Sequence, residues 1–136
     1  GIAMKDIAWS KILSVGVAEI DEDHRKLVHT FNVLQHAVRD GEAPEYVAAI
    51  LEELINCTVW HFSHEERLML KHGFEGMEQH QAAHRALVKA ARSLQEDLAK
   101  ADKALAEAEI IYLEGWLTEH ILTVDQRLGN FLGPLL

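Results

Sequence analysis

Apolar residues recur at alternating steps of three and four residues in four long segments, and this spacing constrains the fold more than any other feature. The segments are 20–39, 44–71, 77–99 and 103–128. Such steps place side chains on one face of an α-helix, so each segment predicts an amphipathic helix. Glycine and proline residues separate the segments, and Pro44 occupies a favoured first-turn position. Four such helices with short connections predict an all-α, antiparallel, up-and-down four-helix bundle.

The residues outside this pattern predict two short flanking segments. Residues 1–18 show no sustained period and predict an N-terminal arm, and 129–136, with two glycines and a proline, predict a C-terminal tail. Asp21 is a candidate N-cap of the first helix. Because 136 residues are enough to form one core, we expect a single domain over 1–136, with the bundle at 19–128.

The charge balance argues against several classes of partner. The net charge is −9 and the pI is about 5.4, so phosphate backbones and anionic lipid surfaces are repelled, and we expect neither nucleic acid nor membrane as a partner. No apolar run reaches the length of a membrane span, and no charged-then-apolar leader opens the chain. The single cysteine, Cys57, cannot form an internal disulfide. These features favour a cytoplasmic protein.

Polar side chains interrupt the apolar face of every predicted helix. They are five histidines and one glutamate: His24, His61, Glu65, His80, His84 and His120. A buried imidazole or carboxylate without a partner costs several kcal/mol, so six of them need a common partner. With antiparallel neighbours, all six fall at one level of the bundle. A metal site is therefore predicted there.

The ligand types narrow the choice of metal. A tetrahedral zinc site needs only three or four ligands, and structural zinc prefers thiolates, of which this chain could offer only Cys57. Calcium and magnesium prefer oxygen to nitrogen. Five imidazoles with a carboxylate suit a pair of near-octahedral transition metals, with iron as the leading candidate. Composition alone leaves manganese or a zinc pair open.

Motifs on all four predicted helices resemble those of the bacterial hemerythrins. The matching stretches are Ile20-Asp21-Glu22-Asp23-His24, His61-Phe62-Ser63-His64-Glu65-Glu66 with Met69, His80-x3-His84, and Trp116-Leu117-x2-His120-Ile121-x3-Asp125. The resemblance extends from about Trp9 to Leu132. It implies a non-haem di-iron centre that binds dioxygen reversibly, with an oxo or hydroxo group between the irons.

The resemblance also implies how the histidines are divided. His80, His84 and His120 would hold one iron, and His24 and His61 the other, which keeps a position open for dioxygen. No catalytic residue is implied. We therefore expect an oxygen carrier, store or supplier that is a monomer and not an enzyme. Two alternatives remain: an oxygen or redox sensor module of a larger signalling protein, and a di-iron peroxidase or oxidase.

Around the open position, the resemblance implies an apolar pocket that excludes water. Its residues would be Leu27, Phe62, Trp116, Leu117 and Ile121. A dry pocket without acid groups offers bound oxygen no proton for O–O cleavage, which favours carriage over activation.

Two carboxylates, Glu65 and Asp125, would bridge the irons by the same resemblance. His120 and Asp125 are five residues apart, which is about 140° around an ideal helix, so Asp125 does not face the interior squarely. We predict a wide, π-like turn near Val124 that brings the two side chains into line.

Two positions depart from the family pattern, in which glutamine usually precedes the first histidine and Tyr-Pro precedes the third helix. Here Asp23 and Phe74-Glu75 stand in those places. Neither departure removes a ligand, but Asp23 adds negative charge beside the site and predicts an altered redox poise. His64, beside Glu65, is expected to be a surface residue, with contact to the ligand shell as the alternative.

Overall fold

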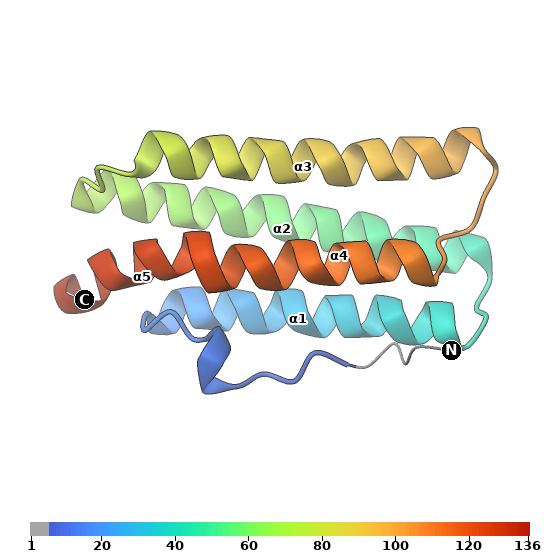
Figure 1. Cartoon of the computed structure of the whole chain (residues 1–136), viewed down its shortest axis with the longest axis horizontal. Helices are drawn as coiled ribbons and strands as arrows, with labels where there is room; N and C mark the ends of the chain where they lie inside the picture. The colour runs from blue at the N-terminus through green and yellow to red at the C-terminus, as the bar shows by residue number, and fades with distance from the viewer. Residues whose placement is uncertain (1–5) are drawn as a thin grey trace.

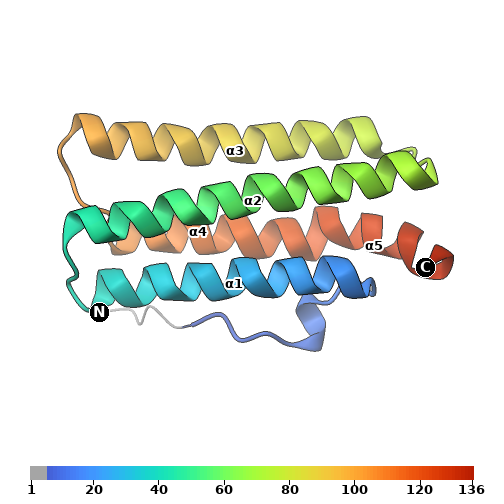
Figure 2. The same ribbon diagram turned by 180° about the vertical axis from the view of Figure 1, so that it is seen from behind.

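The computed structural model describes residues 6–136 and shows the predicted antiparallel four-helix bundle (Figures 1 and 2). Three helices and one composite rod form it: α1 (Ala18–Arg39), α2 (Pro44–His72), α3 (Met77–Lys100), and the rod of α4 (Glu107–His120), η2 (Ile121–Asp125) and α5 (Gln126–Leu132). Within 6–136 there is no β-strand. The all-α fold class is confirmed.

Proline and glycine residues mark two of the helix ends, as predicted. Pro44 begins α2, where its missing N–H would have had no helical partner. Gly73 ends α2 in the left-handed conformation, at φ +67°, and its N–H donates to the Met69 carbonyl. The rod begins at Glu107, whereas the sequence predicted a start at 103. Asp102 has φ +48°, which interrupts helical geometry, and residues 103–106 are extended or irregular.

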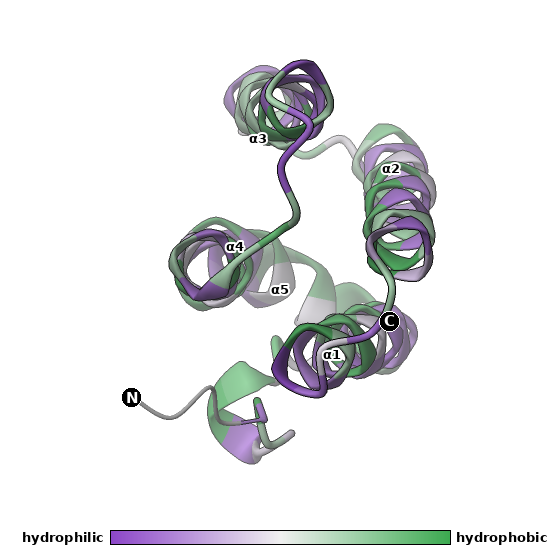
Figure 3. Ribbon diagram, turned by 90° about the vertical axis from the view of Figure 1, so that its right-hand side faces the viewer, coloured by the Kyte–Doolittle hydropathy of each residue, from purple (hydrophilic) through white to green (hydrophobic). Residues whose placement is uncertain are grey.

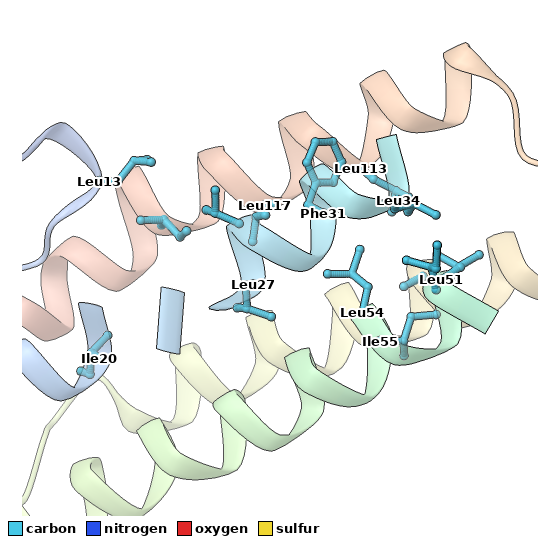
Figure 4. Packing of buried hydrophobic residues seen from close by; sticks show 14 of the residues in the cluster. Leu13, Ile20, Leu27, Phe31, Leu34, Leu51, Leu54, Ile55, Leu113 and Leu117 are labelled. Atoms are coloured by element: carbon cyan, nitrogen blue, oxygen red, sulfur yellow. The ribbon is translucent and has the colours of Figure 1, made fainter. Parts of the chain in front are cut away.

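The core follows the spacing of apolar residues on the four helices. Seen end-on, the helices surround a common interior (Figure 3), and leucine, isoleucine and phenylalanine side chains from α1, α2 and α4 interlock there (Figure 4). Burial is uneven. Whereas α2 contributes eleven buried residues, α3 contributes only His80, His84 and Ala91. The helix α3 is therefore the least buried of the four.

The N-terminal arm lies beside α1 (Figure 1) and is held by polar contacts. Asp21 accepts hydrogen bonds from Ser14 Oγ and from the Val15 N–H. We expected Asp21 to be the N-cap of α1, and this is wrong, because α1 begins a turn earlier, at Ala18. Its carboxylate holds the arm. Gln126 Nε2 also donates to the Ser14 carbonyl, at 2.7 Å.

Gly129 does not stop the last helix as predicted, since α5 continues through it to Leu132. A Cβ atom at position 129 would lie 2.1 Å from the Val15 carbonyl oxygen. Glycine is needed there because the arm crosses the helix backbone directly. None of the helices in 6–136 combines the length and apolar character needed to cross a bilayer.

Candidate metal centre

Seven buried side chains from all four sides of the bundle converge on one place. They form two groups of possible ligands whose donor atoms lie within 4.8 Å of one another: Glu65, His80, His84, His120 and Asp125 in one, and His24, His61, Glu65 and Asp125 in the other. Each of the seven side chains is buried. The structure thus brings together every predicted ligand, and two carboxylates belong to both groups.

Glu65 faces both groups of histidines, one with each oxygen. Its Oε2 lies 2.7 Å from His61 Nε2 and 3.5 Å from His24 Nε2. Its Oε1 lies 2.9 Å from His80 Nε2 and 3.1 Å from His84 Nε2. A carboxylate in this arrangement can place one oxygen on each of two cations.

Asp125 divides its oxygens in the same way. Its Oδ2 lies 2.9 Å from His24 Nε2, and its Oδ1 lies 3.1 Å from His120 Nε2 and 3.3 Å from His80 Nε2. Since all five histidines present Nε2, the two carboxylates and five imidazoles define two adjacent positions of mixed nitrogen and oxygen ligands. This donor set suits a pair of transition-metal ions.

A π-helical turn orients Asp125. The segment η2, Ile121–Asp125, is π-helical between the α-helical segments α4 and α5. The wider turn brings Asp125 round to the side of His120, which regular α-helical geometry would not do. The predicted π-like turn is confirmed.

Several polar atoms of the cluster have no hydrogen bond of acceptable geometry although they are fully buried. They are His24 Nε2, His61 Nε2, His120 Nε2, Glu65 Oε2 and both carboxylate oxygens of Asp125. A buried polar atom without a partner costs about 1–3 kcal/mol. Convergent, unsatisfied donor atoms of this kind fit a bound cation, so the residues present fit a metal pair.

The ionisation of the cluster without metal points the same way. Burial opposes the charged form of His61, but its hydrogen bond to Asp23 and its close contact with the Glu65 carboxylate outweigh it and raise its pKa to about 10. Burial likewise opposes charge on His80, and contacts with Asp125 and Glu65 raise its pKa to about 9. For Asp125, burial and the Glu65 charge are outweighed by His120, His24 and His80, and its pKa is lowered. The site therefore favours positive charge beside its two carboxylates.

An outer set of carboxylates fixes two of the imidazoles. Asp23 accepts hydrogen bonds from His61 Nδ1 at 2.9 Å and from His64 Nδ1 at 2.5 Å. His84 Nδ1 donates to Glu66 Oε2 at 3.1 Å. These contacts direct the Nε2 atoms of His61 and His84 toward the centre. His64, expected at the surface, is instead in contact with the ligand shell through Asp23. The only signal for this in the sequence is that Asp23 and His64 each stand next to a predicted ligand, on two different helices.

The other departure from the family pattern, Phe74, packs beside the centre. Its ring lies edge-on to His80, with centroids 6.4 Å apart, and also contacts Phe131. An aromatic contact therefore supports His80 at this position.

A small cavity of about 10 Å³ adjoins the centre, which is room for about one water molecule. All five residues of the predicted pocket line it: Leu27, Phe62, Trp116, Leu117 and Ile121. The sequence did not indicate Thr58 and Leu87 as further lining residues, because both fit the apolar face of their helices. The ligands that border the cavity are His24, His61, His120 and Asp125. It therefore lies on the side of His24 and His61.

Comparisons with known proteins agree with this site. A model of the hemerythrin HHE cation binding domain matches residues 15–132. A hemerythrin-like protein of Naegleria gruberi is 31% identical over 124 residues, covering 91% of this chain and 92% of that protein. A bacteriohemerythrin of Pseudomonas paraeruginosa is 27% identical over 122 residues, covering 90% of this chain and 78% of that protein. A solved wild-type hemerythrin structure is 26% identical with a TM-score of 0.85, covering 93% of this chain and 98% of that one.

Proposed function

Because this chain belongs to the hemerythrin family, we propose that it binds dioxygen reversibly and does not turn over a substrate. Hemerythrins bind dioxygen at a di-iron centre, and the cluster of histidine, glutamate and aspartate is able to hold metal. The cofactor is thus a pair of iron ions. They would supply the electrons that dioxygen takes up and returns on release.

The division of the carboxylate oxygens supports a specific assignment of ligands. His80, His84 and His120 would hold one iron, and His24 and His61 would hold the other. Glu65 and Asp125 each place one oxygen toward each group, so they could serve both irons, with an oxo or hydroxo group as a further ligand. The iron of His24 and His61 would have fewer protein ligands, which would leave room for dioxygen on the side of the cavity.

The observation that carries reversible binding is the character of the cavity wall. None of its five predicted residues is an acid: four are hydrocarbon side chains, and the buried indole N–H of Trp116 can donate a hydrogen bond but does not ionise. The Thr58 hydroxyl already donates to the Leu54 carbonyl, at 2.7 Å. The one acid on the wall, Asp125, is itself an assigned ligand. Without a proton donor, cleavage of the O–O bond is disfavoured and release of intact dioxygen is favoured.

An anaerobic titration tests this proposal directly. Iron is counted on protein loaded under nitrogen, and optical spectra are recorded as air is admitted and then removed. Two irons per chain, with charge-transfer bands that appear with dioxygen and vanish without it, are expected. Bands that persist after dioxygen is removed would favour redox sensing or oxidase chemistry, and iron well below two per chain would contradict the ligand assignment.

A sensor role is the second candidate, and one contact favours it. Gln126, next to the bridging Asp125, donates to the Ser14 carbonyl in the N-terminal arm. A change at the centre could therefore reach the arm through a single residue. Hydrogen exchange of residues 6–17 in the dioxygen-bound and dioxygen-free forms distinguishes the roles, since a sensor changes arm protection and a carrier leaves it unchanged.

We propose that the protein acts as a monomer in a reducing cytoplasm, with dioxygen as its small-molecule partner. The lone Cys57 and the net charge of −9 support this setting. Sedimentation of the iron-loaded protein tests the monomer, and a dimer would contradict it.

A further inference from the structure

Two side chains that line the cavity also reach the molecular surface, and they come from facing helices. Leu87 of α3 and Trp116 of α4 are half-buried, whereas every other lining residue is buried. At this point a single layer of side chains separates the cavity from solvent. A small molecule can cross such a layer when a side chain changes rotamer, which takes picoseconds to nanoseconds for exposed residues.

The seam in which these two residues lie is the least closely packed of the bundle. Backbones approach closely between α1 and α2 and between α2 and α3, to a lesser extent between α1 and α4, and less still between α3 and α4. The helix α3 also buries only three of its residues fully. Side chains, and not closely packed backbones, therefore seal the α3–α4 seam.

The opposite wall of the cavity offers a less movable barrier. There Phe62 separates the cavity from a surface groove of about 350 Å³ between α2 and α3. Phe62 is 5% exposed and lies flat on the His84 ring, with centroids 3.7 Å apart and an interplanar angle of 6°. His84 is in turn held by Glu65 and Glu66. Movement of Phe62 would break this stacking against a fixed partner.

We propose that dioxygen reaches the centre between α3 and α4, and that the side chains of Leu87 and Trp116 form the gate through which it passes. This inference rests on the proposed function, since it names the route to the same site. Apart from the buried indole N–H of Trp116, the two side chains are apolar, so the passage admits a small uncharged molecule more readily than a hydrated anion, which would lose its water shell there. Leu87 and Trp116 thereby control the rate and selectivity of access.

A pair of neighbouring substitutions on α3 tests the route. Leu87→Ala shortens one of the two gate side chains. Val88→Ala makes a similar truncation at a half-buried residue that lines the α2–α3 groove and not the cavity. Dioxygen is mixed with the diferrous protein in a stopped-flow instrument, and the rate constant for its reaction is measured. We expect Leu87→Ala to react several-fold faster and Val88→Ala to react as the unchanged protein does. Leu87→Phe, which places a larger side chain in the gate, is expected to react more slowly.

A second measurement does not depend on iron chemistry. In the zinc-loaded protein, which has no unpaired electrons, dissolved dioxygen broadens the NMR signals of methyl groups that it reaches. Leu87→Ala is expected to increase broadening of the buried Ile121 methyl signals, and Val88→Ala to leave it unchanged. Acceleration by Val88→Ala alone, or no effect of either Leu87 substitution, would overturn the proposed route. Loss of reversible binding with the broadening pattern intact would overturn the function and leave the route standing.

Discussion

Asp23 links the metal centre to the protein surface through one further histidine. It holds His61 and His64 together, and His64 Nε2 lies 3.5 Å from Glu19 Oε2, on a side chain that is half-exposed. Burial opposes ionisation of Asp23, but its hydrogen bonds to His61 and His64 outweigh this and lower its pKa. It therefore remains a charged acceptor at the back of a ligand imidazole, which increases the electron density on that ligand.

Replacing this charge should weaken the centre without dismantling it. Asp23→Asn keeps an acceptor for His61 Nδ1 but removes the negative charge, so we expect about a 10-fold loss of metal affinity, at the low end of such outer-ligand effects. The midpoint potential of the iron pair should also rise, because the ferric state loses a compensating charge. Competition with a chelator and spectroelectrochemistry measure the two effects. Glu22→Gln, which removes the same charge from an exposed neighbour, should change neither.

Some residues of the site were predictable singly and others were not. His24, His61 and Glu65 were, because a polar residue on a buried face is costly and requires a partner. Asp125 required the family resemblance, since its spacing from His120 points away from the interior on an ideal helix. Leu87 was predicted only as a core residue, because spacing shows which face a side chain takes and not whether a cavity lies beside it.

At the scale of elements, the π-helical turn η2 is the feature on which the second bridging carboxylate depends. Inserting one alanine after Thr123, an exposed residue within the turn, should place the aspartate six residues after His120, more than the wide turn absorbs, and rotate it away from His24. We expect iron content to fall by about half or more, since a carboxylate common to both groups is lost. Thr123→Ala, which keeps the register, should retain full iron content in the same metal analysis. Full iron in the insertion variant would contradict this role for η2.

Two helical glycines should respond to alanine in opposite directions. At Gly129 a Cβ would meet the Val15 carbonyl oxygen at 2.1 Å, whereas at the exposed Gly115 nothing lies within 4 Å. Gly129→Ala should destabilise the protein by about 1–3 kcal/mol through overpacking. Gly115→Ala should stabilise it by about 0.8–1 kcal/mol through helix propensity. Urea unfolding midpoints measure both, and equal shifts would show that the arm does not constrain Gly129.

The same pair of elements shows where sequence-based interpretation of boundaries fails. A glycine near the end of a helical pattern is typical of a stop, and Asp21 near a helix start is typical of a cap. In the structure both residues serve the arm, Gly129 by allowing its close approach and Asp21 by accepting its hydrogen bonds. Helix spacing carries no information about a non-periodic segment that packs across the helices, so these contacts could not be predicted.

For the whole molecule, the ionisation of the centre predicts how stability depends on pH without metal. The pKa values of His61 and His80 are raised from 6.5 to about 10 and about 9, so their stabilising contribution is complete below pH 6.5 and is lost as the pH rises toward 10. Glu65 and Asp125 have lowered pKa values, and their contribution is lost in acid. The metal-free protein should therefore be most stable at mildly acidic pH.

Metal should remove the alkaline part of this dependence. Bound cations replace the protons on the histidines, so the apparent metal affinity should increase with pH up to about 10. Urea unfolding of metal-free and metal-loaded protein across this range checks both statements. A metal-free protein whose unfolding midpoint is constant from pH 6.5 to 10 would contradict the assigned ionisation.

The bundle itself was predictable from the sequence as a whole, because four apolar faces of matching length leave few other ways to bury them. The unequal burial of those faces was not. The third pattern is as regular as the others, yet Leu87, Leu94 and Leu98 remain half-buried. Periodicity gives the direction of a face but not the distance to the neighbouring helix.

That inequality has a consequence for the lifetime of the iron centre. The least buried helix, α3, carries both His80 and His84, so a brief local opening of α3 would leave Glu65, Asp125 and His120 to hold one of the two irons. Local openings of this kind need less free energy than global unfolding. The rate at which a chelator strips iron would therefore report how often α3 detaches, and the protein would lose its metal long before it loses its fold.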